Sequence, residues 1–269
     1  MKVMVIYMTI VRHEWKQGRT AFLLWTAAIA GLLAVCVFLF PEMKGEMEAV
    51  SDMFASMGAF TAAFGMDRLN FGTLVGYYSI ECGNVLGLGG AFYAALCAVS
   101  MLCKEEKEKT AEFLLTHPVS RVRIVTEKLV SVFLQITALN LVVYLVSIGS
   151  MTVIGEEIPW KEINLLHFAY YLMQLELGGI CFGISALLRK GGMGAGLGIA
   201  AMLYVLNLIA NITSSMQFLK WITPFAYCDG AGIVEKGCLD AAHVCIGMLL
   251  CAAGTVAAYS IYTKKDIHG

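Results

Sequence analysis

Residues 20–40 read TAFLLWTAAIAGLLAVCVFLF, a run of apolar residues without a charged side chain. A helix needs roughly 20 such residues to cross the hydrocarbon core of a membrane, which is about 30 Å thick. The run is not followed by the small-residue cleavage site of a signal peptide, so we interpret it as a retained span. This stretch therefore predicts a membrane protein.

The composition of the whole chain agrees with this interpretation. Of the 269 residues, 59% are hydrophobic and only 14% are charged, which excludes an ordinary soluble domain. We expect an all-α membrane protein in which residues 1–269 form a single transmembrane domain. Six stretches are long enough to span the bilayer, namely residues 20–40, 74–103, 129–154, 163–188, 193–217 and 241–263.

The distribution of lysine and arginine predicts the orientation of these spans. Placing the N-terminus in the cytoplasm puts most of the 19 basic residues on the inner side, as the positive-inside rule requires. The basic residues left in outer segments are Lys44, Arg68, Lys161, Lys220 and Lys236. Both termini are therefore expected to be cytoplasmic.

Two segments flank the first span. Residues 1–19 mix apolar and basic side chains, which favours an elbow helix lying in the membrane interface, with a plain extension of the first span as the alternative. The outer segment 41–73 is too long for a tight turn. Its apolar run from Met53 to Met66 predicts a short helix against the outer mouth, with a re-entrant piece as the alternative.

The longest predicted cytoplasmic loop lies between spans two and three and reads KEEKEKTAEFLLTHPVSR over residues 104–121. A helix over 104–120 keeps its charges in water while Phe113 to Leu115 gather near its end. Pro118 ends this helix, and Ser120 is placed to cap the next one. The simpler interpretation is an amphipathic helix that rests on the lipid surface.

This loop resembles the coupling-helix signature of permease subunits of type-2 ABC exporters. The signature is a Glu, a small residue, Thr and Glu, then two or three apolar residues before Pro-Val-Ser-Arg. The residues that carry the resemblance are Glu108, Thr110, Glu112, Phe113, Leu114, Leu115, Pro118 and Arg121. Lys109 departs from the family, which often has glycine there. The elbow, the six spans and the phrase LNFGTLVGYY at residues 69–78 are similar too, so the resemblance covers essentially the whole chain.

The resemblance implies a pair of permease subunits, as a homodimer or heterodimer, docked on two copies of an ABC ATPase subunit. The coupling residues would dock that ATPase, and the substrate would be exported between the permeases across a cell membrane, which we expect to be a bacterial plasma membrane. The sequence itself holds no phosphate-binding loop, since its nearest run, GIVEKG at 232–237, continues with Cys238. We therefore expect no enzymatic activity and no cofactor in this chain, with ATP and Mg bound by the partner.

Polar residues inside the spans are candidates for the substrate path. A carboxylate at bilayer depth costs at least about 2.5 to 3.5 kcal/mol, so Glu81 and Glu176 should face protein or water, or be protonated. We add Asn84 and Asn207 as path candidates. The structural alternative is that either carboxylate accepts a hydrogen bond from the side-chain amide of Gln135, Asn140, Gln174 or Asn207.

Two other classes of function remain open. A secondary transporter would carry protons on Glu81 or Glu176, and a membrane scaffold or sensor would move no substrate. An intramembrane serine protease is excluded because Ser185 and His243 fall near opposite membrane surfaces. The sequence offers no spacing of metal ligands and no basic surface for nucleic acid. Membrane lipid is expected as a partner because the spans would cross the bilayer.

Small residues predict how the spans pack. Glycines four apart, such as Gly83 with Gly87 and Gly179 with Gly183, permit close helix approach. We expect spans two and five to pack tightly, either within one chain or across the dimer interface that the resemblance implies. Cys228 and Cys238 share the last outer loop, and a disulfide between them would require an oxidising exterior.

Overall fold

The structure, a computed structural model, describes residues 9–109, 119–188 and 192–265, without the side chains of residues 47–52 and 54–56. In these ranges the chain forms helices and no strands. The elements are α2 (Thr9–Ser56), α3 (Ala59–Ala63), η1 (Met66–Arg68), α4 (Leu74–Cys82), η2 (Gly83–Leu88), α5 (Gly89–Val99), α6 (Lys104–Lys107), α8 (Arg121–Ile154), α9 (Trp160–Leu187), α10 (Met193–Ile212), η3 (Ser214–Trp221), η4 (Pro224–Cys228), α11 (Gly230–Lys236) and α12 (Ala241–Lys264).

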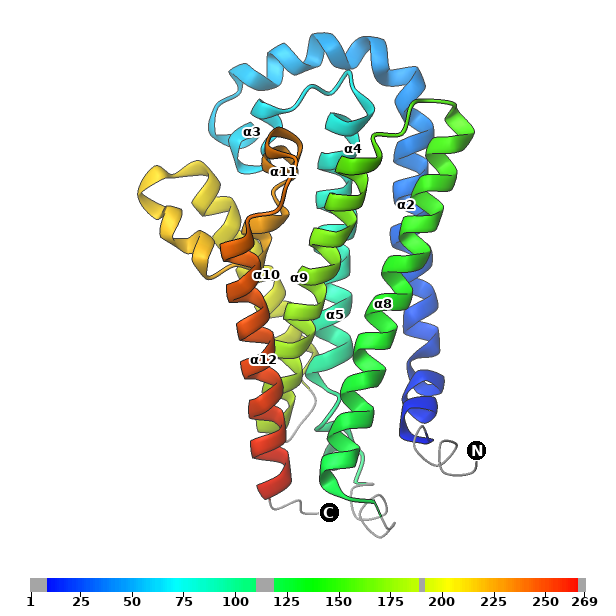
Figure 1. The fold of residues 1–269 in the computed structure, drawn as a ribbon, viewed down its shortest axis with the longest axis vertical. Helices are drawn as coiled ribbons and strands as arrows, with labels where there is room; N and C mark the ends of the chain where they lie inside the picture. Colours follow the sequence, from blue (N-terminus) through cyan, green and yellow to red (C-terminus); the bar gives the residue numbers. More distant parts are fainter. Residues whose placement is uncertain (1–8, 110–118, 189–191, 266–269) are drawn as a thin grey trace.

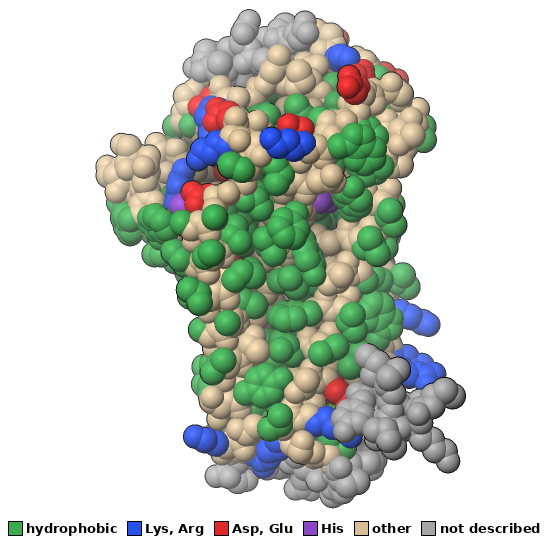
Figure 2. All heavy atoms as spheres, in the orientation of Figure 1, with side chains coloured by type: hydrophobic (Ala, Val, Ile, Leu, Met, Phe, Trp, Pro, Cys, Tyr) green, Lys and Arg blue, Asp and Glu red, His purple; other side chains and the backbone are tan. Residues whose placement is uncertain are grey.

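Six helices in the described part are long and apolar enough to cross a membrane, which confirms the six predicted spans. They are α2, the combined α4, η2 and α5, and then α8, α9, α10 and α12 (Figure 1). The start of α2 and the end of α12 lie at the same end of the bundle, here called the lower end. On the face shown in Figure 2, apolar side chains cover the middle of the molecule while charges gather toward the two ends.

The central helix is α9, which packs against α5, α8 and α12. Glycines make the contact with α12 possible. A Cβ atom on Gly183 would lie only 2.5 Å from the Gly254 backbone oxygen, and one on Gly254 would lie 2.6 Å from the Gly179 oxygen. The predicted close approach at Gly179 and Gly183 is therefore confirmed, since larger side chains would separate the two backbones.

Spans two and five also pack closely, as predicted. A Cβ atom on Gly196 of α10 would lie 3.1 Å from the Ala95 carbonyl oxygen and 2.8 Å from a Val99 methyl group of α5. Span two is interrupted by the π-helix η2, where Gly83 and Gly87 make room for the ring of Tyr170. Short π-helical segments of this kind occur frequently at functional sites.

The first span differs from the prediction at both ends. Helix α2 begins at Thr9 and continues without a break through the predicted elbow region, so for residues 9–19 the structure has the extension of the first span. The helix also runs past Pro41 to Ser56 and bends over the upper end of the bundle (Figure 1). A proline inside a helix removes one hydrogen bond and kinks the helix, which here continues beyond it. Residues 1–8 lie outside the described part.

The chain between spans five and six re-enters the bundle. Helix α10 ends at Ile212, five residues before the predicted end of the span, and η3 projects sideways from it (Figure 1). The next segment, η4, turns inward and buries Phe225, Tyr227 and Cys228. Segment η4, a short 3-10 helix, packs against α9 and α12, so protein surrounds its backbone.

Candidate functional site

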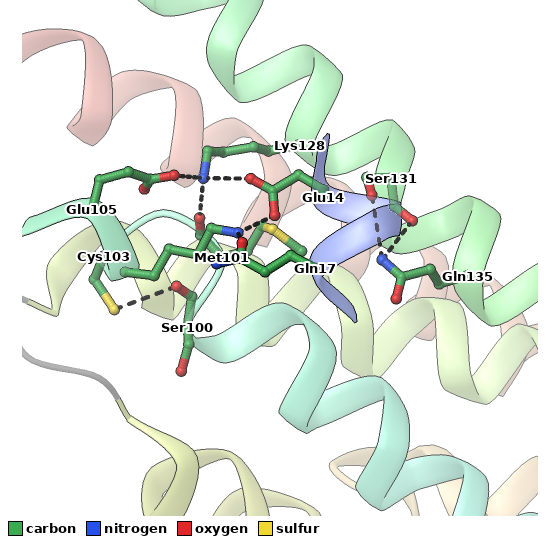
Figure 3. Close-up of polar contacts among 10 residues, drawn as sticks. Glu14, Gln17, Ser100, Met101, Cys103, Glu105, Lys128, Ser131 and Gln135 are labelled. Carbon is green, nitrogen blue, oxygen red and sulfur yellow. Dashed lines mark hydrogen bonds and ion pairs between the residues drawn. The ribbon is translucent and has the colours of Figure 1, made fainter. Parts of the chain in front are cut away.

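The root of the 104–121 loop is held by a buried group of charges at the lower end, here called the basal charge cluster and made of Glu14, Lys104, Glu105 and Lys128 (Figure 3). Lys128 of α8 is fully buried. Its ammonium group lies 3.1 Å from Glu14 of α2, pairs with Glu105 of α6 and donates a 2.7 Å hydrogen bond to the Met101 carbonyl oxygen. Lys104 pairs with the other oxygen of Glu14. The cluster therefore joins α2, α6 and α8.

A second set of contacts joins α6 to the end of α12. Glu106 pairs with Lys265 at 2.8 Å, and Lys265 also donates a 2.9 Å hydrogen bond to the Leu188 carbonyl at the end of α9. Arg121, at the start of α8, donates a 2.6 Å hydrogen bond to the Lys265 carbonyl oxygen. The consecutive residues Glu105 and Glu106 thus tie α6 to α8 on one side and to the end of α12 on the other.

The start of α8 is fixed as the sequence predicts. Ser120 is the N-cap residue, and its hydroxyl oxygen accepts a hydrogen bond from the Arg123 backbone N–H at 3.3 Å. Arg123 pairs with Glu127 at 2.7 Å, and Glu127 in turn accepts a 2.9 Å hydrogen bond from the Ile10 backbone N–H of α2. The start of α8, where the loop ends, is therefore anchored to the bundle, as is α6, where the loop begins.

The predicted helix over 104–120 is not continuous. Helix α6 ends at Lys107, and Lys109 has a φ of 56°, in the left-handed region where an α-helix cannot continue. Glu108 is exposed after the end of α6. The other predicted docking residues, except Arg121, lie outside the described part of the chain, namely Thr110, Glu112, Phe113, Leu114, Leu115 and Pro118.

Two of the four path candidates line one pocket in the upper half of the bundle. Asn84 of η2 and Asn207 of α10 both border a cavity of about 60 Å³, together with Tyr170, Tyr204 and the re-entrant residue Asp229. The Asn207 Oδ1 atom is buried and accepts no hydrogen bond from the described residues. A buried polar atom of this kind is available to a ligand or a water molecule.

The two carboxylates lie apart from this pocket and from each other. Glu81 faces α2, where the Cys36 thiol donates a hydrogen bond to it over 3.6 Å. Glu176 is 1% exposed and accepts a 2.8 Å hydrogen bond from the Tyr227 hydroxyl of η4. Its partner is therefore not among the amides that the sequence suggested. A Cβ atom on Gly247 of α12 would overlap the Glu176 carboxylate, so only glycine leaves room for it.

An ion pair ties the upper loops together beside the pocket. Arg68 of η1 lies 2.6 Å from Asp229 and 3.6 Å from Glu235 of α11. Burial by itself would lower the pKa of Arg68, but the hydrogen bond and the charges of these acids raise it above its ordinary value. The guanidinium therefore holds the re-entrant segment against the loop that follows α3.

Sequence reasoning missed the contributions of Glu14, Lys128 and Tyr227. Glu14 lies between charged and polar neighbours, with Arg12, His13 and Lys16 close by, so the sequence gave no signal of its burial. Lys128 lies at the edge of an apolar run, which was a weak signal. Tyr227 lies in a short loop whose burial depends on tertiary structure. Cys228 and Cys238 are free thiols, and no group of metal-ligating side chains occurs among the described residues.

Comparison with known proteins gives one result that covers nearly the whole chain. The model of the family described as "ABC-2 family transporter protein" matches residues 8–267. A search of the curated proteins found no match. The matched range contains the six spans, the basal charge cluster and the loop that it anchors. The chain therefore belongs to the ABC-2 transporter family, whose members are multi-pass membrane subunits of ABC transporters.

Proposed function

We propose that this chain is the permease subunit of an ATP-driven exporter and that residues 104–120 receive the motion of a separate ATPase subunit. The observation that carries the proposal is the anchoring of α6, at the root of this loop, to three sides of the bundle. Lys104 ties it to α2, Glu105 ties it to α8, and Glu106 ties it to Lys265 at the end of α12. Because the anchoring contacts are short and largely buried, a displacement of the loop would move several spans together rather than only the loop.

The partners follow from the family. An ABC-2 permease works with an ABC ATPase, and we propose two ATPase copies, which bind ATP and Mg, below a pair of permease subunits in the plasma membrane of a bacterium. Both termini and the basal charge cluster would then face the cytoplasm. The positive-inside distribution supports this side, since Arg121, Arg123, Lys264 and Lys265 all lie at the lower end.

Movement of the paired spans would open the substrate path. Spans two and five are packed through Gly196, so they would shift as one unit when the loop is displaced. The pocket between Asn84 and Asn207 lies where these spans meet the re-entrant segment, and it is our candidate for part of that path. Glu81 and Glu176 face other helices of the same chain and are assigned to packing in the state described here.

The docking role is tested by replacing Phe113 and Leu114 with Asp and measuring co-purification with the ATPase subunit. A charged group in a desolvated anchor position costs several kcal/mol, so the complex should be reduced at least tenfold. The matched control is Phe218→Asp in η3, an exposed apolar residue on the segment that projects sideways from α10, which should leave the complex intact. An undiminished complex with continued ATP-driven transport by the double variant would remove the coupling role.

A further inference from the structure

Segment η3 (Ser214–Trp221) exposes apolar side chains instead of burying them. None of its residues is buried, and Phe218, Trp221 and the cap residue Ile222 are each more than half exposed. The segment projects sideways from the end of α10 (Figure 1), and on the face shown in Figure 2 apolar side chains cover the lower side of the projection. An exposed apolar surface of this kind marks a contact with a membrane or with another protein.

The 3-10 geometry of η3 separates its polar and apolar side chains. Side chains three residues apart eclipse one another in such a helix. Ser214, Gln217 and Lys220 therefore form one polar row. The other two rows carry the apolar side chains of the segment and its cap, namely Met216, Phe218, Leu219, Trp221 and Ile222. The segment is thus amphipathic along its length, which is the pattern of a helix that lies in the plane of a membrane interface.

The position of Trp221 gives the depth of η3 in a membrane. Its ring stacks on the imidazole of His243 in the first turn of α12, with 4.2 Å between the ring centroids and 15° between the ring planes. From Lys264, the last residue of α12, to His243 the helix rises by roughly 31 Å, at 1.5 Å per residue. A hydrocarbon core is about 30 Å thick. With Lys264 at the lower boundary of the core, Trp221 therefore lies at the upper boundary.

The surroundings of the stacked rings fit this depth. Asp240 lies 3.1 Å from the His243 Nδ1 atom and caps α12, so a charged group adjoins the rings on the side of the loop. Trp is enriched at membrane interfaces because its ring is apolar and its N–H group is polar. Ile209 and Ile212 of α10 are also exposed, and no charged residue lies between them and Lys220. The apolar surface of the span therefore continues onto η3.

We propose that η3 is an interfacial anchor that binds the lipid surface of the upper leaflet. Phe218, Trp221 and Ile222 meet the boundary of the acyl chains, and the row of Gln217 and Lys220 faces the head groups and water. A lipid surface fits η3 better than a second copy of the chain does, because the apolar rows lie at the depth of the interface and continue the surface of the span. The anchor requires no ATPase and no transported substrate, so it stands apart from the proposed function.

The experiment uses two matched variants of the full chain in phosphatidylcholine vesicles. Phe218→Trp and Gln217→Trp, each made in a Trp221→Phe background, place a fluorescent ring on neighbouring exposed residues of different rows. The signal of the new ring is the difference from Trp221→Phe alone. One quencher is phosphatidylcholine with bromine on the acyl chain close to the head group, and the other is iodide on both sides of the membrane.

The two quenchers should distinguish the rows. The Phe218→Trp signal should lose most of its intensity with the brominated lipid and little with iodide, and the Gln217→Trp signal should behave in the opposite way. Equal quenching of the two variants by the brominated lipid would overturn the proposed orientation. Quenching of Phe218→Trp by iodide alone would place η3 in water, and quenching by neither would mean that protein covers it, as a second copy of the chain would. Either result would overturn the anchor.

Discussion

Lys109 departs from the coupling-helix signature and also has a left-handed backbone conformation. It stands where the signature that this loop resembles often has glycine. Its φ of 56° fits such a glycine, because a left-handed conformation costs a residue with a Cβ atom about 1–2 kcal/mol. The sequence showed the departure from the family but gave no reason to expect strain. The reason lies in the end of α6, which requires a left-handed residue to close it.

We therefore expect Lys109→Gly to stabilise the protein by about 0.5–1 kcal/mol, because glycine relieves the strain but gains entropy in the unfolded chain. The free energy of unfolding in detergent micelles is the measurement. The matched control is Lys107→Gly, inside α6, which should lose about 1 kcal/mol. A loss of stability in Lys109→Gly would show that the lysine side chain itself holds this turn.

A second prediction at this scale concerns the Tyr227 hydroxyl. Tyr227→Phe leaves the buried Glu176 carboxyl without the 2.8 Å hydrogen bond that it accepts, which should cost about 1–3 kcal/mol. Denaturation of Tyr227→Phe, of Glu176→Gln and of the double variant forms a cycle. The double variant should cost less than the sum of the two single changes. Additive costs would mean that the two side chains do not interact in the folded protein.

At the level of the helices, the six spans were predictable because each is a long, mainly apolar stretch with few charged residues. What the sequence did not predict depends on tertiary contacts. Helix α2 continues through Pro41 because proline kinks a helix without necessarily ending it. Segment η4 is buried because Tyr227 bonds to Glu176 and Tyr170 bonds to the Cys228 carbonyl. Neither contact is visible in local composition, although the lack of charge between Trp221 and Cys228 was a usable signal.

The contact between α9 and α12 can be tested through its glycines. Gly183→Ala places a Cβ atom 2.5 Å from the Gly254 oxygen and should destabilise the protein by about 1–3 kcal/mol, since backbone cannot move aside as a side chain can. Gly149→Ala in α8 is the control, because its Cβ atom would meet nothing within 4 Å. It should raise stability by about 0.5–1 kcal/mol. Equal effects of the two substitutions, measured by denaturation, would contradict the close packing.

At the scale of the whole molecule, the candidate site was only partly predictable. The sequence indicated the loop at 104–121 and the cap at Ser120, but the basal charge cluster joins residues from three distant parts of the chain. Of the path candidates, Asn84 and Asn207 come together in one pocket. Glu81 and Glu176 do not join them, because helical position on α4 and α9 turns these carboxylates toward other neighbours.

The basal charge cluster should be necessary for the integrity of the lower end. Lys128→Met leaves the buried Glu14 with only Lys104 and leaves the partly buried Glu105 without its lysine, which should cost about 3–5 kcal/mol in the free energy of unfolding. Adding Glu105→Gln removes one unpaired charge and should recover at least about 1 kcal/mol. Lys161→Met, at an exposed lysine, should change stability by less than about 0.5 kcal/mol. A Lys128→Met protein as stable as the wild type would show that the cluster does not anchor the loop.

The loop anchored by this cluster is proposed to dock an ATPase subunit. Site-specific photo-crosslinking tests this docking, with a photoreactive phenylalanine analogue placed at Leu114 or at Phe60, which is 60% exposed at the upper end. We expect a crosslinked product with the ATPase subunit from position 114 and none from position 60. A product from position 60 alone, or none from position 114 in a complex that still hydrolyses ATP, would contradict the docking of the ATPase at this loop.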